Sequence, residues 1–134
     1  MGVKTTRYEY HHMGIPTTVI RKGERYSSKF KMYTSGGEDN EFRVQYHRFE
    51  ADSPLHPLLK TLPHVAFKVD DLEAAIKGKE VVLGPYEPIP GFKVAAIIEC
   101  GAPIELIETT LSEEQIWQGD HSNTVIYPNT DPNS

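Results

Sequence analysis

Hydrophobic and polar residues alternate along most of the chain, in the pattern of strands that bury one face. Glycine, proline and polar residues separate the alternating segments, as turns do between strands. In chain order the predicted strands cover residues 8–15, 30–34, 42–50, 64–69, 80–84, 92–100 and 104–109. This pattern predicts a β-rich chain with few helices.

The clearest helical segment is DDLEAAIKGK. Asp70 or Asp71 provides the N-cap, and the apolar residues Leu72, Ala75 and Ile76 recur at helical spacing, so they form the buried stripe. A glycine two residues after this stripe ends the helix.

A second short helix is predicted in LSEEQIW, where Ser112 and Gln115 have the spacing of a capping box. The intervening SPLHPLLKTLP contains too many prolines for a strand or a long helix, and we interpret it as a bridge between two halves. After Trp117 the chain becomes polar and proline-bearing, which indicates a tail rather than core. The segments SGGEDN and CGAP are predicted turns, and Cys100 beside the second turn is interpreted as a small buried filler.

The two halves of the chain resemble each other. Each begins with a histidine-bearing strand (YHHMGI and HVAFKV) and ends on a strand with oxygen- or nitrogen-bearing side chains in alternation (FRVQYHRFE and APIELIET). A repeat of roughly 50 residues suggests a duplicated β-rich module. The first copy has only weak apolar periodicity in TTVIRKGERYSSK, so its helix is expected to be short or absent.

The alternation of strands places His64 away from the predicted helix. Residues two apart share a face of a strand, so Val65, Phe67 and Val69 face the helix and His64 lies on the other side. The same argument, applied to the remaining strands, leaves one face that gathers a set of polar side chains: His12, Gln45 or His47, His64 and Glu105. Two imidazoles, a carboxylate and an amide or third imidazole would bind a divalent ion such as Zn, Ni, Fe, Mn or Co.

Composition and charge indicate the class of protein and exclude some classes of partner. The 134 residues, with 38% hydrophobic and 25% charged residues, are typical of one globular domain, residues 1–134. A net charge of −5 without a basic stripe argues against a nucleic-acid partner. No apolar run approaches 18 residues and no signal peptide is visible, so we expect no membrane association and a cytoplasmic location. The single cysteine excludes a disulfide within the chain.

Four stretches, HHMGIPT, VQYHRFE, PHVAFKVDDLEAAIKGKEV and GAPIELIE, resemble the vicinal oxygen chelate superfamily of glyoxalase I, bleomycin-resistance proteins and extradiol dioxygenases. The resemblance implies an α+β fold. Its two βαβββ modules, at about 7–52 and 62–110, form a curved, cup-like mixed sheet with helices outside. The C-terminal helix and tail predicted above follow at 111–134. It also implies a homodimer.

The resemblance further implies a divalent metal inside the cup, bound by His12, Gln45, His64 and Glu105. Glutamine replaces the commoner glutamate at position 45, and His47 remains an alternative fourth ligand. Such a metal chelates two neighbouring oxygens of a substrate.

The function expected from the resemblance is that of a glyoxalase-type lyase or isomerase acting on a small oxygenated metabolite. The metal would stabilise an enediolate while Glu105 or His47 moves a proton. A non-catalytic small-molecule binder of the bleomycin-resistance type and an Fe(II) ring-cleaving dioxygenase are the alternatives. Tyr10, Phe49 and Ile107 are predicted to line the cup or simply to fill it, and we expect Arg43 and Lys68 to be solvated or to contact an anionic substrate.

Overall fold

A computed structural model of the chain describes residues 6–118, in which eight strands form one mixed sheet with three short helices. The strands are β1 (Glu9–Pro16), β2 (Arg25–Ser27), β3 (Met32–Gly36), β4 (Val44–Phe49), β5 (His64–Lys68), β6 (Glu80–Ile89), β7 (Phe92–Glu99) and β8 (Ala102–Thr109). The helices are α1 (Pro57–Thr61), α2 (Leu72–Ile76) and α3 (Glu113–Gln118). The structure is therefore of the predicted mixed α+β class.

The strand order is β2-β3-β4-β1-β5-β8-β7-β6. In the first half of the sheet (β1–β4) the first and last strands pair in parallel, and the other pairs are antiparallel. The second half (β5–β8) repeats this arrangement, with β5 and β8 in parallel. The strands of both halves thus pair in the same way, but only the second half has a helix, α2, between its first two strands, so the predicted βαβββ order is found in that half alone.

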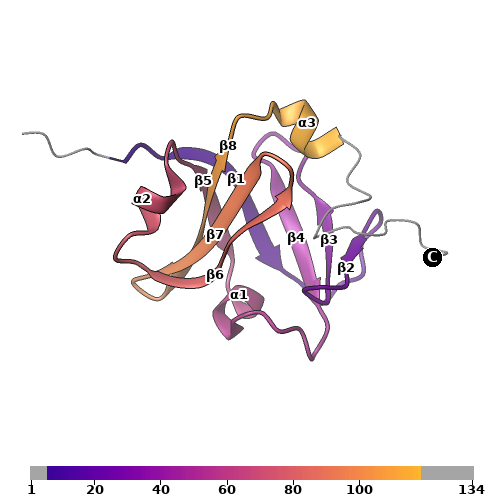
Figure 1. The fold of residues 1–134 in the computed structure, drawn as a ribbon. Helices are drawn as coiled ribbons and strands as arrows, with labels where there is room; N and C mark the ends of the chain where they lie inside the picture. Colours follow the sequence, from indigo (N-terminus) through magenta and orange to yellow (C-terminus); the bar gives the residue numbers. More distant parts are fainter. Residues whose placement is uncertain (1–5, 119–134) are drawn as a thin grey trace, which may run out of the picture.

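The two halves meet along an antiparallel ladder between β1 and β5. In this ladder His12 pairs with Ala66, and Gly14 pairs with His64. If one half is superposed on the other, His12 falls on His64 and Gly14 falls on Ala66. The two histidines therefore occupy equivalent positions. The sheet curls on either side of this seam into a half-barrel, with β2 at the outer end of one wing and β6 at the outer end of the other (Figure 1).

Helix α2 covers the outer face of the second half. Asp71 is its N-cap and accepts a hydrogen bond from the Ala74 N–H at 3.2 Å, as the sequence predicted. Leu72 and Ala75 are buried against strands β7 and β8. Phe67 and Val69 pack in the same apolar cluster, as predicted, whereas Val65, the third residue of the predicted face, is not among its members.

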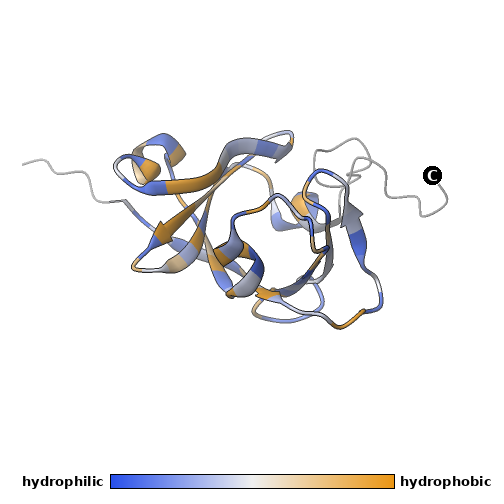
Figure 2. Cartoon of the chain, turned by 90° about the horizontal axis from the view of Figure 1, so that it is seen from below, coloured by the Kyte–Doolittle hydropathy of each residue, from blue (hydrophilic) through white to orange (hydrophobic). Residues whose placement is uncertain are grey.

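Apolar residues are concentrated in the second half. The outer cluster under α2 and an inner cluster on the concave face both consist of buried residues from positions 66–116. Strands of the second half are correspondingly more hydrophobic than those of the first half (Figure 2). No helix lies between β1 and β2, so the weak periodicity of that segment is explained.

Several boundaries differ from the sequence prediction. Strand β2 was not predicted, because it has only three residues. Strand β4 begins at Val44 rather than at residue 42, since Arg43 has a φ of 53° and interrupts the extended backbone. Strand β6 continues beyond the predicted end at Gly84 to Ile89, through register shifts that follow Leu83.

Cys100 is exposed, so its interpretation as a buried filler was wrong. It forms a two-residue hairpin turn with Gly101, because Glu99 and Ala102 still pair across the turn. Both turn residues have positive φ, 54° and 81°, as type I′ hairpin turns require. A side chain at such a turn points away from the sheet.

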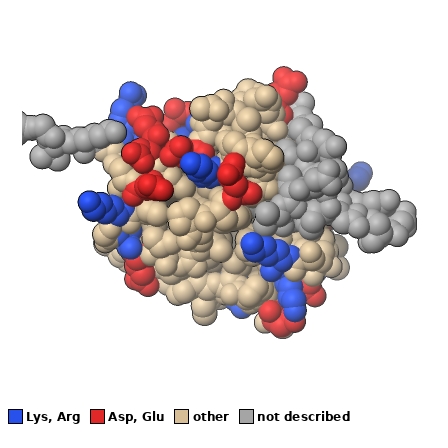
Figure 3. All heavy atoms as spheres, viewed as in Figure 1, with Lys and Arg blue, Asp and Glu red and all other residues tan. Residues whose placement is uncertain are grey.

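The helices lie at the periphery of the sheet. Ser112 and Gln115 form the predicted capping box at the start of α3, with reciprocal hydrogen bonds of 2.8 and 3.2 Å. Pro57 starts α1 within the predicted bridge, and the predicted tail, residues 119–134, lies outside the described residues. Among residues 6–118 no helix is long and apolar enough to cross a membrane. Acidic side chains gather in the upper left of the face shown in Figure 3, with basic ones among them.

Candidate metal centre

Three predicted ligands meet on the concave face of the sheet. His12 on β1, His64 on β5 and Glu105 on β8 come from three adjacent strands. Glu105 Oε2 lies 3.3 Å from His12 Nε2 and 3.5 Å from His64 Nε2. One ligand atom from each residue lies within 4.8 Å of the others, so this group is close enough to hold a metal ion.

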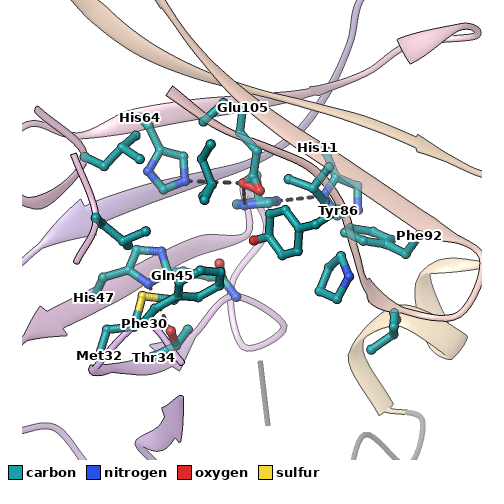
Figure 4. Close-up of a pocket in the computed structure, with 18 of the residues that line it drawn as sticks. His11, Phe30, Met32, Thr34, Gln45, His47, His64, Tyr86, Phe92 and Glu105 are labelled. Atoms are coloured by element: carbon teal, nitrogen blue, oxygen red, sulfur yellow. Dashed lines mark hydrogen bonds and ion pairs between the residues drawn. The ribbon is translucent and has the colours of Figure 1, made fainter. Parts of the chain in front are cut away.

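The register explains why these residues converge and where Gln45 belongs. Glu105 is the partner of Ala66 in the parallel ladder of β5 and β8, and Gln45 is the partner of Gly14 in the equivalent ladder of β1 and β4. Gln45 is therefore the counterpart of Glu105 in the first half. It is buried and lines the same pocket as the three other residues. Figure 4 shows it together with His64 and Glu105.

Gly14 leaves the space that the imidazoles occupy. A Cβ atom added to this residue would overlap with His64 Cε1 and lie 2.8 Å from His47 Nε2. The two rings therefore approach the backbone of β1 more closely than any side chain at position 14 would allow. The rings of His47 and His64 stack, with centroids 5.5 Å apart and planes at 22°.

His47 is the second polar residue that β4 supplies to the pocket. Its Nδ1 lies 3.0 Å from Thr34 Oγ1, whereas its buried Nε2 has no hydrogen-bond partner among residues 6–118. Burial, followed by the neighbouring His64, lowers the pKa of His47 to about 3. The ring is thus neutral near pH 7, with an unused nitrogen beside His64.

Glu105 is held as a carboxylate. Burial alone would raise the pKa of Glu105, but the charges and hydrogen bonds of His12 and His64 outweigh it and hold this pKa well below its usual range. An ionised carboxylate beside imidazole nitrogens is the donor set that borderline divalent ions prefer. The residues present therefore fit a metal of the predicted kind.

His11 is a site residue that the strand alternation missed. Strict alternation along β1 would place His11 on the opposite face from His12, together with Met13. A register shift between Tyr10 and His12 breaks the alternation, so both histidines are buried and both line the pocket. The same irregularity leaves Tyr10 exposed, and the expectation that Tyr10 lines the cup was wrong.

The pocket around this group is a cavity of about 160 Å³ with a polar end and an apolar remainder. Phe49 lines it as predicted, whereas Ile107 is fully buried in the inner apolar cluster and is not among the lining residues. The apolar lining comes from both wings of the sheet and from α1 and α3, and includes Phe30, Met32, Leu55, Leu59, Tyr86, Phe92 and Trp117.

Arg43 and Lys68 do not line the pocket. Both face Glu113 at the start of α3, with nitrogen–oxygen distances of 4.0 Å and 3.9 Å. Arg43 also donates a hydrogen bond to the carbonyl oxygen of His11 at 2.5 Å. These cations surround the helix that closes one end of the pocket.

No protein-family model and no curated protein matches the chain. We therefore infer the function from the geometry of the site and from the sequence motifs.

Proposed function

We propose that the protein is a metal-dependent lyase or isomerase of the glyoxalase type that acts on a small oxygenated metabolite. The observation that carries this proposal is the convergence of His12, His64 and Glu105 within 4.8 Å inside a largely apolar pocket. Gln45, at the position equivalent to Glu105, would be the fourth ligand. Three neutral donors and one carboxylate leave a divalent ion with a net positive charge.

A bound divalent ion would supply Lewis acidity, polarising a substrate carbonyl and stabilising the negative charge of an enediolate. The protein's own residues then have separate tasks. Glu105 contacts His12 and His64, whereas His47 Nε2, at the edge of the group, has no hydrogen-bond partner within the described part of the chain. We therefore assign His47, with its ring oriented by Thr34, as the group that accepts a proton from the substrate carbon. The negative charge that develops on the enediolate beside the ring would raise the low pKa of His47 as the proton arrives.

The apolar part of the pocket limits the size and the polarity of the substrate. Aromatic and aliphatic side chains exclude water from the space beside the donor group, which strengthens electrostatic interactions there. A cavity of about 160 Å³ is smaller than the ~300–1,000 Å³ of most ligand pockets. A compact molecule with two neighbouring oxygens and a short apolar body fits these dimensions and this chemistry.

The proposal is tested first by metal content and then by proton exchange. Protein purified without chelator should bind one divalent ion per chain, measured by elemental analysis before and after loading with Zn, Ni, Mn, Co or Fe(II). A panel of α-hydroxy ketones in deuterated water should then incorporate deuterium next to the carbonyl, observed by NMR. EDTA should abolish the incorporation, and protein that accepts none of these ions would refute the proposal.

Two other functions each have one observation in their favour. The donor group is a two-histidine, one-carboxylate set, which is the ligand set of many Fe(II) oxygenases. Oxygen uptake with a catechol and ferrous iron would identify that activity. The largely apolar lining also suits a protein that only sequesters a small molecule. Ligand-dependent stabilisation without turnover, unchanged in His12→Ala, would identify that role.

A further inference from the structure

His12 has a second imidazole directly behind it. The Nδ1 atoms of His11 and His12 are 2.7 Å apart, and both rings are buried. Two nitrogen lone pairs at this distance would repel each other, so a proton lies between them. One ring therefore donates its Nδ1–H and the other accepts it, and this choice fixes the tautomer of both rings.

The remaining nitrogens face two different carboxylates. His12 Nε2 faces Glu105 in the donor group at 3.3 Å. His11 Nε2 lies 2.9 Å from Glu113 Oε1, although the angle is not that of a hydrogen bond and this nitrogen has no hydrogen-bond partner in the described part of the chain. A carboxylate oxygen so close to a buried nitrogen favours an N–H there over a lone pair.

Glu113 is held in this place by its own helix and by cations. Trp117 donates its indole N–H to Glu113 Oε1 at 3.0 Å and stacks on the His11 ring, with centroids 5.7 Å apart and planes at 8°. Lys68 and Arg43 approach Glu113 from the sheet at 3.9 and 4.0 Å. The position of the carboxylate relative to His11 is thus set by α3 and by the strands beneath it.

We propose that His11 and Glu113 are positioning residues that hold His12 in the tautomer able to bind a metal through Nε2. Glu113 keeps the proton of His11 on Nε2, so His11 Nδ1 accepts the Nδ1–H of His12. When the donor group holds an ion, that ion replaces the hydrogen bond of His12 Nε2 to Glu105, and His12 Nε2 offers it a lone pair. In the opposite arrangement a bare His11 nitrogen would face a carboxylate, and His12 Nε2 would carry a proton. This inference rests on the proposed metal site.

Zinc affinity tests the proposal directly. Competition with a chromogenic chelator measures the zinc dissociation constant of the full chain and of its variants. Glu113→Gln retains an acceptor for Trp117 but removes the charge, and it should weaken zinc binding by about 10-fold, because loss of such a partner typically costs 10–100-fold. Glu114→Gln makes the same charge change at an exposed position of the same helix and should stay within about twofold of the wild type.

His11→Phe removes the acceptor but retains an aromatic ring against Trp117, and it should weaken zinc binding by about 10- to 100-fold. If this variant does not fold, as judged by near-ultraviolet circular dichroism, Glu113→Gln still decides the question. Nitrogen-15 NMR of the imidazoles adds a readout that packing alone would not change. In the zinc-loaded wild type it should show the proton of His12 on Nδ1 and that of His11 on Nε2.

The proposal is overturned if the wild type binds zinc but Glu113→Gln binds it equally well, or if His11 carries its proton on Nδ1 in the loaded protein. Either result would leave the metal site itself intact. If the wild type binds no zinc, nor any other divalent ion, the proposed function fails together with this inference, and the first titration shows it before any variant is compared.

Discussion

At the scale of single residues, the site depends on a position that has no side chain. Gly14 lies where the rings of His64 and His47 approach β1, and an added Cβ would overlap with the His64 ring. Its counterpart in the second half is Ala66, so a methyl group is tolerated at one of the two equivalent positions and excluded from the other. The missing methyl group at Gly14 leaves room for the ring of His47 in the first half.

We predict that Gly14→Ala displaces His64 and weakens metal binding by at least about 10-fold, since site geometry must be kept within a few tenths of an ångström. Isothermal titration with zinc measures this. Gly78→Ala is the control, because no atom of residues 6–118 lies within 4 Å of the added Cβ, its own chain neighbours aside. Its positive φ of 77° would cost about 1 kcal/mol of stability, yet zinc affinity should be unchanged. Equal zinc affinities in the two variants would contradict the prediction.

Thr34 is predicted to matter through His47. Thr34→Val keeps the volume but leaves the buried His47 Nδ1 without its partner, which should lower the unfolding free energy by about 1–3 kcal/mol. Urea denaturation measures the loss. The same substitution at the exposed Thr110 should change stability by less than about 0.5 kcal/mol. A Thr34→Val variant as stable as the Thr110 variant would show that the hydroxyl does not support His47.

At the scale of elements, helix α2 should contribute to stability but not to metal binding. Asp71→Ala removes the N-cap and should cost about 1 kcal/mol in urea denaturation, whereas Asp70→Ala should cost less than about 0.5 kcal/mol. Because α2 lies on the outer face of the sheet, both variants should bind zinc as the wild type does. Weakened zinc binding in Asp71→Ala alone would show that the helix also positions the site.

The strands also show which features can be predicted from sequence. Alternation placed His64 and Glu105 correctly because β5 and β8 run without irregularity through these positions. It misplaced His11 and Tyr10 because a register shift adds one residue to β1, and no residue type marks that shift in YHHMGI. The adjacent histidines were the only available signal, since a single strand face cannot bury both.

Helix caps could be predicted from the sequence because they are defined by residues close together in the chain. The N-cap at Asp71 and the capping box of Ser112 and Gln115 are defined by spacings of a few residues, and the structure has both. The position of Cys100 was missed although its signal is equally local. A residue followed by glycine between two apolar strands is the pattern of a type I′ turn, and here this pattern outweighs the hydrophobic character of cysteine.

At the scale of the whole molecule, the two halves have the same strand topology but contribute unequally to the apolar core. Both buried apolar clusters belong to the second half, whereas the first half supplies Thr34, Gln45 and His47 to the pocket. The first half therefore depends more on the seam between β1 and β5 and on polar contacts. The pairing of these distant strands could not be derived from alternation, because nothing local specifies which strands become neighbours.

The resemblance to vicinal oxygen chelate proteins predicts a homodimer. In the described chain β6 is an edge of the sheet, and an edge strand leaves backbone groups available for pairing or packing with a second copy. Light scattering coupled to gel filtration should give twice the mass of one 15.1 kDa chain. A mass of one chain at every concentration tested would contradict the prediction.

A metal at this site would join the two halves, because its ligands come from β1 on one side of the seam and from β5 and β8 on the other. Metal that binds only the folded chain stabilises it by about 2.7 kcal/mol at a free concentration of 100 times the dissociation constant. We therefore predict that zinc raises the urea midpoint and that EDTA reverses the increase. His64→Ala removes a ligand from the second half, so its midpoint should be the same with zinc and with EDTA. A zinc-dependent increase of equal size in His64→Ala would place the ion elsewhere, and the seam would then have to be stabilised by backbone pairing alone.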